Sequence, residues 1–364
     1  MPKKIIIAGG GTGGHIFPAI AIANALRKID PSCELLFVGA KGKMEMEKVP
    51  QAGYEIRGID IVGFNRSSLI KNVGLPFKLI RSLVQVRRIL NDFKPDAVIG
   101  VGGYSSFPVL RLAQTRRIPT FIHESNSFAG KSNILLGKKA TKVFVATEGM
   151  EKFFPREKLL VTGNPVRENI TTSRISREDG IRFFSLDPGK QTILATGGSL
   201  GAKGINEAIG DNIERFRTAP VQLIWQTGKP FASRAKELSR GMNNVWTNDF
   251  IPQMEYAYAA ADVVISRAGA MAIAELSVAG KPVIFVPFPF AAEDHQTANA
   301  RALEEKGAAL MVRDADASAN LIREALQLAA DKQAQIKLQN NIKAFAKTDA
   351  DKKIADEVFR SLQK

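Results

Sequence analysis

The N-terminal stretch Lys3–Pro18, KKIIIAGGGTGGHIFP, decides the fold that we predict for this chain. Ile5–Ile7 is a short, wholly apolar run, and glycine occupies five of the six positions from 9 to 14. From Ile16 onward, apolar residues recur at helical spacing. This order predicts a buried strand, a glycine turn and a helix. Because glycine lets a ligand approach the backbone and a helix N-terminus attracts anions, we expect a site for a phosphorylated ligand.

The glycines also match the dinucleotide-binding pattern G-x-G-x-x-G. A nicotinamide enzyme with this pattern carries an acid at the end of the second strand, about 20 residues further on. The second strand predicted here, Glu34–Val38, runs into Gly39-Ala40-Lys41 and offers no acid there. This argues against an NAD(P) oxidoreductase, which stays as one alternative. Glycines that serve only a tight turn are another.

Length and composition indicate two domains, with the positive charge concentrated in the first. The chain has 364 residues, 45% of them hydrophobic, which is ample for two cores. Its single cysteine excludes an internal disulfide framework, and no apolar run reaches the roughly 18 residues of a membrane span. Residues 1–165 carry 25 Lys and Arg against 12 Asp and Glu, whereas residues 166–364 carry 26 against 24. The basic half points to nucleic acid or an anionic membrane, and the absence of nucleic-acid-binding motifs argues against nucleic acid.

Strands and helices alternate along most of the chain. Strands are predicted near residues 3–8, 34–38, 54–57, 97–100, 120–122, 142–145 and 159–162, and the alternation resumes over 192–312. This pattern predicts an α/β protein with two doubly wound parallel sheets. The turn at 163–165 separates a first domain, residues 1–165, from a second, residues 166–344. We expect the last helix, about 345–364, to pack back on the first domain.

Glycine turns follow predicted strands at three places: residues 9–14, 100–103 and 197–201. Ligands of open α/β sheets bind at the C-terminal ends of the strands. Three such turns in two sheets therefore predict a charged ligand in a cleft between the domains.

Candidate proton-transfer residues also lie at strand ends. His15, His123 and His295 each fall at a predicted strand-to-helix junction, and histidine is the usual proton-transfer residue near neutral pH. A structural imidazole is the alternative for each, and their spacing does not suit a metal. Glu124 follows a predicted buried strand and can act as a base or orient one. Asn126 can donate to a sugar or phosphate oxygen, or it can cap a helix, as can Ser125.

The second half offers a nucleotide site after the strand predicted at 263–266. Small residues over 268–274 let phosphates approach a helix N-terminus, and Glu275 can accept both hydroxyls of a ribose. A solvated acid near the start of a helix is the alternative for Glu275. Asp314-Ala315-Asp316 has the spacing of a metal-binding pair, but it lies in a polar turn, and we interpret it as surface.

The segment Ile61–Lys94 carries seven Lys and Arg against one acid, interleaved with large apolar residues. Apolar residues flanked by cations suit an anionic bilayer interface. An ordinary amphipathic helix with a solvated basic face is the alternative. The residues that we expect at the membrane are Leu69, Leu75, Phe77, Lys78 and Arg81.

Together, six motifs resemble the MurG family, the N-acetylglucosaminyltransferases of peptidoglycan synthesis. They occur in the family's order over nearly the whole chain: residues 11–18 (GTGGHIFP), 102–104 (GGY), 123–126 (HESN), 163–167 (GNPVR), 197–202 (GGSLGA) and 294–296 (DHQ). The resemblance implies a GT-B fold, two Rossmann-like domains that face each other across a cleft. It also implies GlcNAc transfer from UDP-GlcNAc to the C4 hydroxyl of undecaprenyl-pyrophosphoryl-MurNAc-pentapeptide with inversion.

The resemblance assigns roles to individual residues. Gly102, Gly103 and Tyr104 are assigned to the acceptor side. The residues themselves agree with such a reaction: the acceptor hydroxyl needs a base, for which His15 and Glu124 are the candidates, and helix N-termini with a cation can stabilise the diphosphate, so no metal or cofactor is expected. The implied donor contacts are Thr12, Gly13, Gly14, Asn126, Arg167, Ser199, Ile251, Ala270, Met271, Ala272, Ile273, Ala274, Glu275 and Gln296. The expected partners are both substrates and an anionic membrane surface, without nucleic acid, at the cytoplasmic face of a bacterial cell membrane. A diacylglycerol glycosyltransferase and a non-catalytic, nucleotide-regulated membrane-binding protein remain alternatives.

Overall fold

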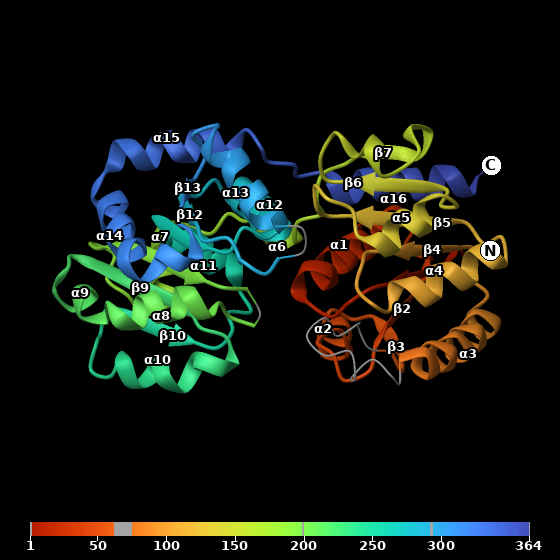
Figure 1. Ribbon diagram of the computed structural model, residues 1–364, viewed down its shortest axis with the longest axis horizontal. Coiled ribbons are helices and arrows are strands. Elements are labelled where there is room, and N and C mark those ends of the chain that lie inside the picture. Colours follow the sequence, from red (N-terminus) through yellow and green to blue (C-terminus); the bar gives the residue numbers. More distant parts are fainter. Residues whose placement is uncertain (1, 62–74, 199, 292–293, 364) are drawn as a thin grey trace. The chain divides into compact units, whose positions relative to one another are not determined.

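A computed structural model describes residues 2–61, 75–198, 200–291 and 294–363 of the chain (Figure 1). The chain divides into two compact units. The first comprises Met1–Arg167 and Thr348–Lys364, and the second comprises Glu168–Lys347. Each unit holds one sheet in which every strand pair is parallel, which confirms the predicted fold class of two Rossmann-like, doubly wound domains.

The sheet of the first unit has the order β3-β2-β1-β4-β5-β6-β7. The apolar run at its centre explains this arrangement, because Ile5, Ile6 and Ile7 are fully buried between helices on both faces. The strand order reverses between β1 and β4, the point where ligands of such sheets bind. The strands are β1 (Lys4–Ala8), β2 (Glu34–Ala40), β3 (Glu55–Ile59), β4 (Ala97–Gly100), β5 (Thr120–Glu124), β6 (Lys142–Val145) and β7 (Leu159–Val161).

The helices of the first unit include one from the far end of the chain. They are α1 (Gly13–Ile29), α2 (Glu45–Gln51), α3 (Leu75–Phe93), α4 (Ser106–Thr115), α5 (Lys131–Gly137) and α16 (Ala350–Leu362), with short 3-10 turns at Met150–Lys152 and Arg156–Lys158. The C-terminal α16 packs against α1. Its apolar face buries Ile354, Ala355 and Val358 in the same core as Ile22 and Leu26 of α1.

The second unit repeats the architecture with the order β10-β9-β8-β11-β12-β13. Its strands are β8 (Gln191–Thr196), β9 (Val221–Gln226), β10 (Val245–Asn248), β11 (Val263–Ser266), β12 (Val283–Phe285) and β13 (Leu310–Met311). Its helices are α6 (Glu168–Thr171), α7 (Arg177–Phe183), α8 (Lys203–Asp211), α9 (Ile213–Thr218), α10 (Ala232–Leu238), α11 (Met254–Ala260), α12 (Ala270–Ala279), α13 (His295–Glu304), α14 (Ala317–Ala330) and α15 (Lys332–Lys343), with 3-10 turns at Lys229–Phe231 and Asp314–Asp316.

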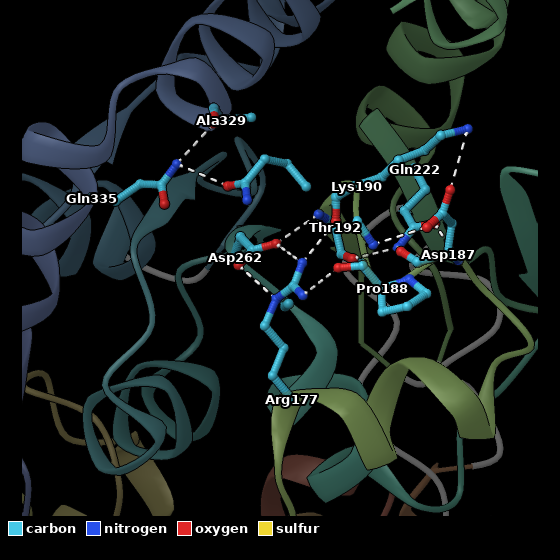
Figure 2. Close-up of polar contacts among 12 residues, drawn as sticks. Arg177, Asp187, Pro188, Lys190, Thr192, Gln222, Asp262, Ala329 and Gln335 are labelled. Carbon is cyan, nitrogen blue, oxygen red and sulfur yellow. Dashed lines mark hydrogen bonds and ion pairs between the residues drawn. The ribbon is translucent and has the colours of Figure 1, made fainter. Parts of the chain in front are cut away.

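A polar network joins the start of this sheet to α7 (Figure 2). The Arg177 guanidinium donates to both carboxylate oxygens of Asp262, over 3.0 and 2.8 Å, and to the carbonyls of Pro188 and Lys190. Asp262 also accepts the Thr192 backbone N–H at 2.8 Å. Bidentate, charge-assisted hydrogen bonds of this kind are stronger than hydrogen bonds between neutral groups. It lies at the N-terminal ends of β8 and β11, so we interpret it as structural.

Candidate active site

His15 lies near the start of α1, directly after the glycine turn. Its Nδ1 is 3.1 Å from the carbonyl oxygen of Gly10. A carbonyl only accepts, so Nδ1 carries the proton and the Nε2 lone pair is available as a base. Burial lowers the pKa of His15 below its usual 6.5, although the Gly10 carbonyl and the charges of Glu124 and Glu45 oppose this shift. The imidazole is therefore neutral at pH 7 and able to take a proton.

The two glycine turns at the centre of this sheet interlock. Gly10 N–H donates to the Gly102 carbonyl at 3.3 Å. A Cβ at Gly102 would lie 2.7 Å from Cδ2 of His15, and one at Gly103 would overlap the Gly10 carbonyl oxygen. Both positions have positive φ, 98° and 84°, which favours glycine further. Gly102 and Gly103, two of the three predicted acceptor-side residues, thus pack against His15 and the glycine turn before it. The third, Tyr104, is exposed.

Glu124 ends β5 and is almost completely buried. Its carboxylate accepts the N–H of Asn126 at 3.1 Å, the N–H of Gly130 at 3.0 Å, and the side-chain amides of Asn133 at 2.9 Å and Asn126 at 3.3 Å. A carboxylate offers about four acceptor positions, and these four donors occupy them. Of the two predicted bases, the geometry therefore favours His15. Glu124 instead orders the loop that follows β5. Capping of a helix by Ser125 or Asn126 is wrong, because α5 begins only at Lys131.

His123 precedes Glu124 on β5 and is also buried. Neither ring nitrogen makes a hydrogen bond of normal geometry within the described part of the chain. Burial lowers the pKa of His123 to about 4, and the Gly163 backbone and the Asn164 side chain only partly oppose this. This imidazole is therefore neutral and lies in the core, but among the described residues it lacks the hydrogen-bond partners of a satisfied structural imidazole.

The predicted donor residues of the first unit lie around the start of α1. Thr12 precedes the helix with extended backbone angles, and Gly13 and Gly14 form its first turn. The Arg167 guanidinium stacks on the ring of Phe17, with its central carbon 4.6 Å from the ring centroid. This cation is thereby held beside the first turns of α1.

In the second unit, Gln226 joins two predicted donor elements. Its amide donates to the Gly198 carbonyl at 3.0 Å, and its carbonyl oxygen accepts the Ile251 N–H at 3.0 Å. Because the Ile251 N–H already donates to Gln226, the backbone group that Ile251 can offer to the base of a nucleotide is its carbonyl. Ser199, predicted on the same glycine loop, lies outside the described residues.

Glu275 lies within α12, whose first residues Ala270–Ala274 follow the end of β11. It is 7% exposed, and its Oε2 accepts the Tyr258 hydroxyl at 3.0 Å. The alternative of a solvated acid is therefore wrong. Gln296, near the start of α13, accepts the Phe288 N–H at 3.0 Å and so ties the loop after β12 to the helix.

Sequence reasoning missed an ion pair beside this loop. The Arg267 guanidinium donates to the Val286 and Pro287 carbonyls, at 3.0 and 3.1 Å, and pairs with Asp314. None of residues 314–316 is buried, as the interpretation of this turn as surface expects, but the pair with Arg267 leaves the Asp314 side chain only 23% exposed. Forty-seven residues separate the two partners, and no pattern in the sequence near either residue predicts such a pairing.

A second missed residue is Glu45, the first residue of α2. The residue is 1% exposed, and its carboxylate accepts the backbone N–H groups of Gly11 and Ala40. In the sequence it looks like any acid in the first turn of a helix.

Comparison with known proteins assigns the chain to a family. Residues 5–145 match the glycosyltransferase family 28 N-terminal domain, and residues 192–358 match the glycosyltransferase family 28 C-terminal domain. A MurG crystal structure from Acinetobacter baumannii superposes with a TM-score of 0.74 at 29% identity, covering 99% of this chain and 100% of that one. The Neisseria meningitidis UDP-GlcNAc 2-epimerase, at 18% identity and a TM-score of 0.67, shares the fold. The chain is thus a family 28 glycosyltransferase of GT-B fold.

Full-length relatives narrow the assignment. One from Parabacteroides distasonis is 50% identical over 364 residues, covering 99% of both chains, and one from Cytophaga hutchinsonii is 49% identical over 358 residues, covering 98% of this chain and 96% of its own. Both are named UDP-N-acetylglucosamine–N-acetylmuramyl-(pentapeptide) pyrophosphoryl-undecaprenol N-acetylglucosamine transferase. The chain belongs to this MurG family.

Proposed function

We propose that this chain transfers GlcNAc from UDP-GlcNAc to the C4 hydroxyl of undecaprenyl-pyrophosphoryl-MurNAc-pentapeptide, converting lipid I to lipid II. The observation that carries the proposal is identity of about one half to transferases of that name over essentially the whole chain. The site geometry supports it, because a neutral histidine with an available Nε2 lies on α1, directly after the glycine turn that follows the central strand β1. The reaction belongs to peptidoglycan synthesis, on which cell shape and division depend.

The donor binds the second unit in this proposal. The N-terminus of α12 and the glycine turn after β8 receive the diphosphate with backbone N–H groups. Glu275 accepts the ribose hydroxyls, with Tyr258 holding its carboxylate in place. The Ile251 carbonyl accepts from the uracil ring, and Gln296 holds the loop after β12 beside the site. The other donor contacts that we propose are Thr12, Gly13, Gly14, Asn126, Arg167 and Ser199. Arg167 supplies the cation for the departing diphosphate.

Transfer requires one proton acceptor and one leaving group. His15 Nε2 removes the proton of the acceptor hydroxyl as that oxygen bonds to C1 of GlcNAc. The bond from C1 to the diphosphate breaks, and UDP departs with the electron pair. A direct displacement of this kind inverts the configuration at C1. Gly102, Gly103 and Tyr104 line the acceptor side.

A transfer assay with separate donors and acceptors tests the proposal. We expect the purified chain to move radiolabelled GlcNAc from UDP-GlcNAc onto the lipid-linked muramoyl-pentapeptide, and we expect little product with UDP-glucose as donor. Diacylglycerol in the same detergent serves as the matched acceptor. Turnover of diacylglycerol without turnover of the muramoyl lipid would identify the chain as another lipid glycosyltransferase. UDP-GlcNAc binding without any turnover would favour a nucleotide-regulated binding protein.

A lipid-linked acceptor places the enzyme at the membrane, and α3 is the surface that we propose for this contact. Phe77 is 76% exposed and Ile80 61%, and with Val84 they occupy one face of the helix. Lys78 and Arg81 accompany them, and Arg81 pairs with Asp60 at 3.0 Å. Apolar side chains among cations suit an anionic bilayer interface better than nucleic acid. The predicted contact begins at Leu75 in the described chain, and Leu69 lies outside the described residues.

None of the described helices combines the length and apolarity that crossing a bilayer requires. We place the enzyme peripherally at the cytoplasmic face of the cell membrane, where its nucleotide donor is supplied.

Replacing Phe77 and Ile80 together by serine should weaken binding to phosphatidylglycerol-containing vesicles about tenfold. Full burial of two such side chains would be worth about 3–6 kcal/mol. Side chains at a bilayer interface are only partly buried, and a loss of about 1.4 kcal/mol already lowers the affinity tenfold. Vesicle sedimentation measures the change. Ile336→Ser is the matched control, because Ile336 is 56% exposed on α15 of the other unit. If the double variant and the control partition alike, α3 is not the membrane contact.

A further inference from the structure

One peptide group links Glu45 to His15. The N–H of Gly11 donates to Oε2 of Glu45 at 2.8 Å, and the carbonyl of Gly10 accepts from Nδ1 of His15 at 3.1 Å. That N–H and that carbonyl belong to the same amide, the bond between Gly10 and Gly11. The carboxylate, the amide and the imidazole therefore form an unbroken chain of hydrogen bonds that ends at Nε2.

The surrounding backbone is built to hold this peptide in one orientation. Gly10 and Gly11 have φ values of 151° and 91°, which side-chain-bearing residues rarely adopt. The Glu45 carboxylate occupies the space that a Cβ on Gly10 would need. Its other oxygen accepts the N–H of Ala40 at 2.9 Å, which anchors it to the end of β2.

We propose that Glu45 is a positioning residue for His15 that acts through the single peptide group between Gly10 and Gly11. This inference rests on the proposed role of His15 as the base. A carboxylate that accepts from an amide N–H polarises the amide, and its carbonyl then accepts more strongly. A stronger bond to Nδ1 holds the proton there, orients the ring and makes Nε2 more basic. The arrangement resembles a carboxylate hydrogen-bonded to a histidine, except that one peptide group lies between the carboxylate and the imidazole.

The charges around His15 agree in sign with this role. Glu45 on α2 and Glu124 on β5 both raise the pKa of His15, against the dominant effect of burial. His123, also on β5, lies close enough for the two imidazoles to disfavour each other's protonation. Removing the charge of Glu45 should therefore lower the pKa of His15 further. A neutral residue that only tied β2 to the glycine turn would have no such effect on the pKa of His15.

Glu45→Gln tests the proposal in the full-length enzyme. Glutamine has one acceptor oxygen for two N–H donors and no charge. We expect kcat to fall by about 10- to 100-fold, the loss that is typical when the hydrogen-bond partner that orients a metal-bound histidine is removed. KM for UDP-GlcNAc should change less than twofold. The acid limb of the kcat/KM profile, and the His15 titration followed by NMR without substrate, should both move to lower pH.

Two control variants separate positioning from stability. Asp96→Asn removes a carboxylate that accepts a backbone N–H of β1, Lys4 N at 2.8 Å, at the opposite end of the strand. Glu47→Gln removes an exposed acid from α2 itself. Both should leave the pH profile and the His15 titration where they are. An unchanged His15 titration in Glu45→Gln, or an equal shift in Asp96→Asn, would overturn the proposal.

A measurement on the unaltered protein keeps the proposal testable if Glu45→Gln does not fold. The Gly11 amide proton should shift with the same midpoint as the His15 ring, because the Gly11 N–H belongs to the peptide group whose carbonyl accepts from His15 Nδ1. A Gly11 amide that ignores the His15 titration contradicts the link. If His15→Ala retains full turnover while Gly11 and His15 titrate together, the link stands and the assignment of the base fails.

Discussion

His15→Ala should lower kcat about a thousandfold while UDP-GlcNAc still binds with nearly unchanged affinity. A positioned general base contributes about 10²- to 10⁴-fold to a rate. The imidazole supplies Nε2 as that base, because Nδ1 is committed to the Gly10 carbonyl. The donor contacts that we propose in the second unit do not involve this ring. Initial rates with both substrates and calorimetric titration with UDP-GlcNAc measure the two quantities.

His15→Gln distinguishes chemistry from packing, because its side chain fills much of the same space but cannot accept a proton near pH 7. It should lose as much activity as His15→Ala. Glu124→Gln should lose less, because its carboxylate already accepts four hydrogen bonds and orders the loop of Asn126. The ranking of the three variants decides between the two predicted bases. Retention of more than a third of the wild-type kcat in His15→Gln would remove His15 from that role.

The unfolding free energy of the first unit should fall by about 3 kcal/mol between pH 6.5 and pH 4 because of His123 alone. The folded pKa of about 4 lies below the usual 6.5, since burial disfavours the charged ring. The unfolded chain therefore binds the proton first as the pH falls. Stability that is present above pH 6.5 is lost as the pH approaches 4, at about 1.4 kcal/mol per pKa unit.

His123→Phe removes the titration while keeping a flat ring in the same core. The difference in unfolding free energy between wild type and variant should shift by about 3 kcal/mol in favour of the variant over this range. Both tryptophans, Trp225 and Trp246, lie in the second unit. Tryptophan fluorescence would therefore follow the unfolding of the second unit. Amide hydrogen exchange of β5, corrected for intrinsic rates, measures the stability of the first unit instead. Parallel pH dependence in the two proteins would show that His123 does not carry the effect.

Local patterns predicted both sheets correctly, because a buried parallel strand is a short apolar run whatever it pairs with. The run at Ile5–Ile7, the glycines after it and the apolar spacing of α1 lie within one segment. The order of such segments along the chain then predicts two doubly wound sheets. Family motifs such as GTGGHIFP also allowed the activity to be predicted, because each of them is a short continuous stretch of sequence.

Residues whose partners are distant in the chain were not predictable in this way. Thirty-four residues separate Glu45 from Gly11, and Arg267 and Asp314 are also far apart in sequence. Nothing in the sequence near Glu45 says that its carboxylate is buried under a glycine turn rather than solvated. The proposal of His15 rather than Glu124 as the base depends on the same kind of information, because the sequence does not show that four hydrogen-bond donors surround the Glu124 carboxylate.

The sequence by itself determined the fold class, the family and the strand ends that carry the candidate residues, because these depend on patterns within short stretches. Only the tertiary structure decided which hydrogen-bond partners each polar side chain has. It turned His15 so that Nε2 is available, surrounded Glu124 with donors and set Glu45 beneath the Gly10–Gly11 amide. Hydrogen bonds depend on direction and distance between groups, and the fold alone brings those groups together.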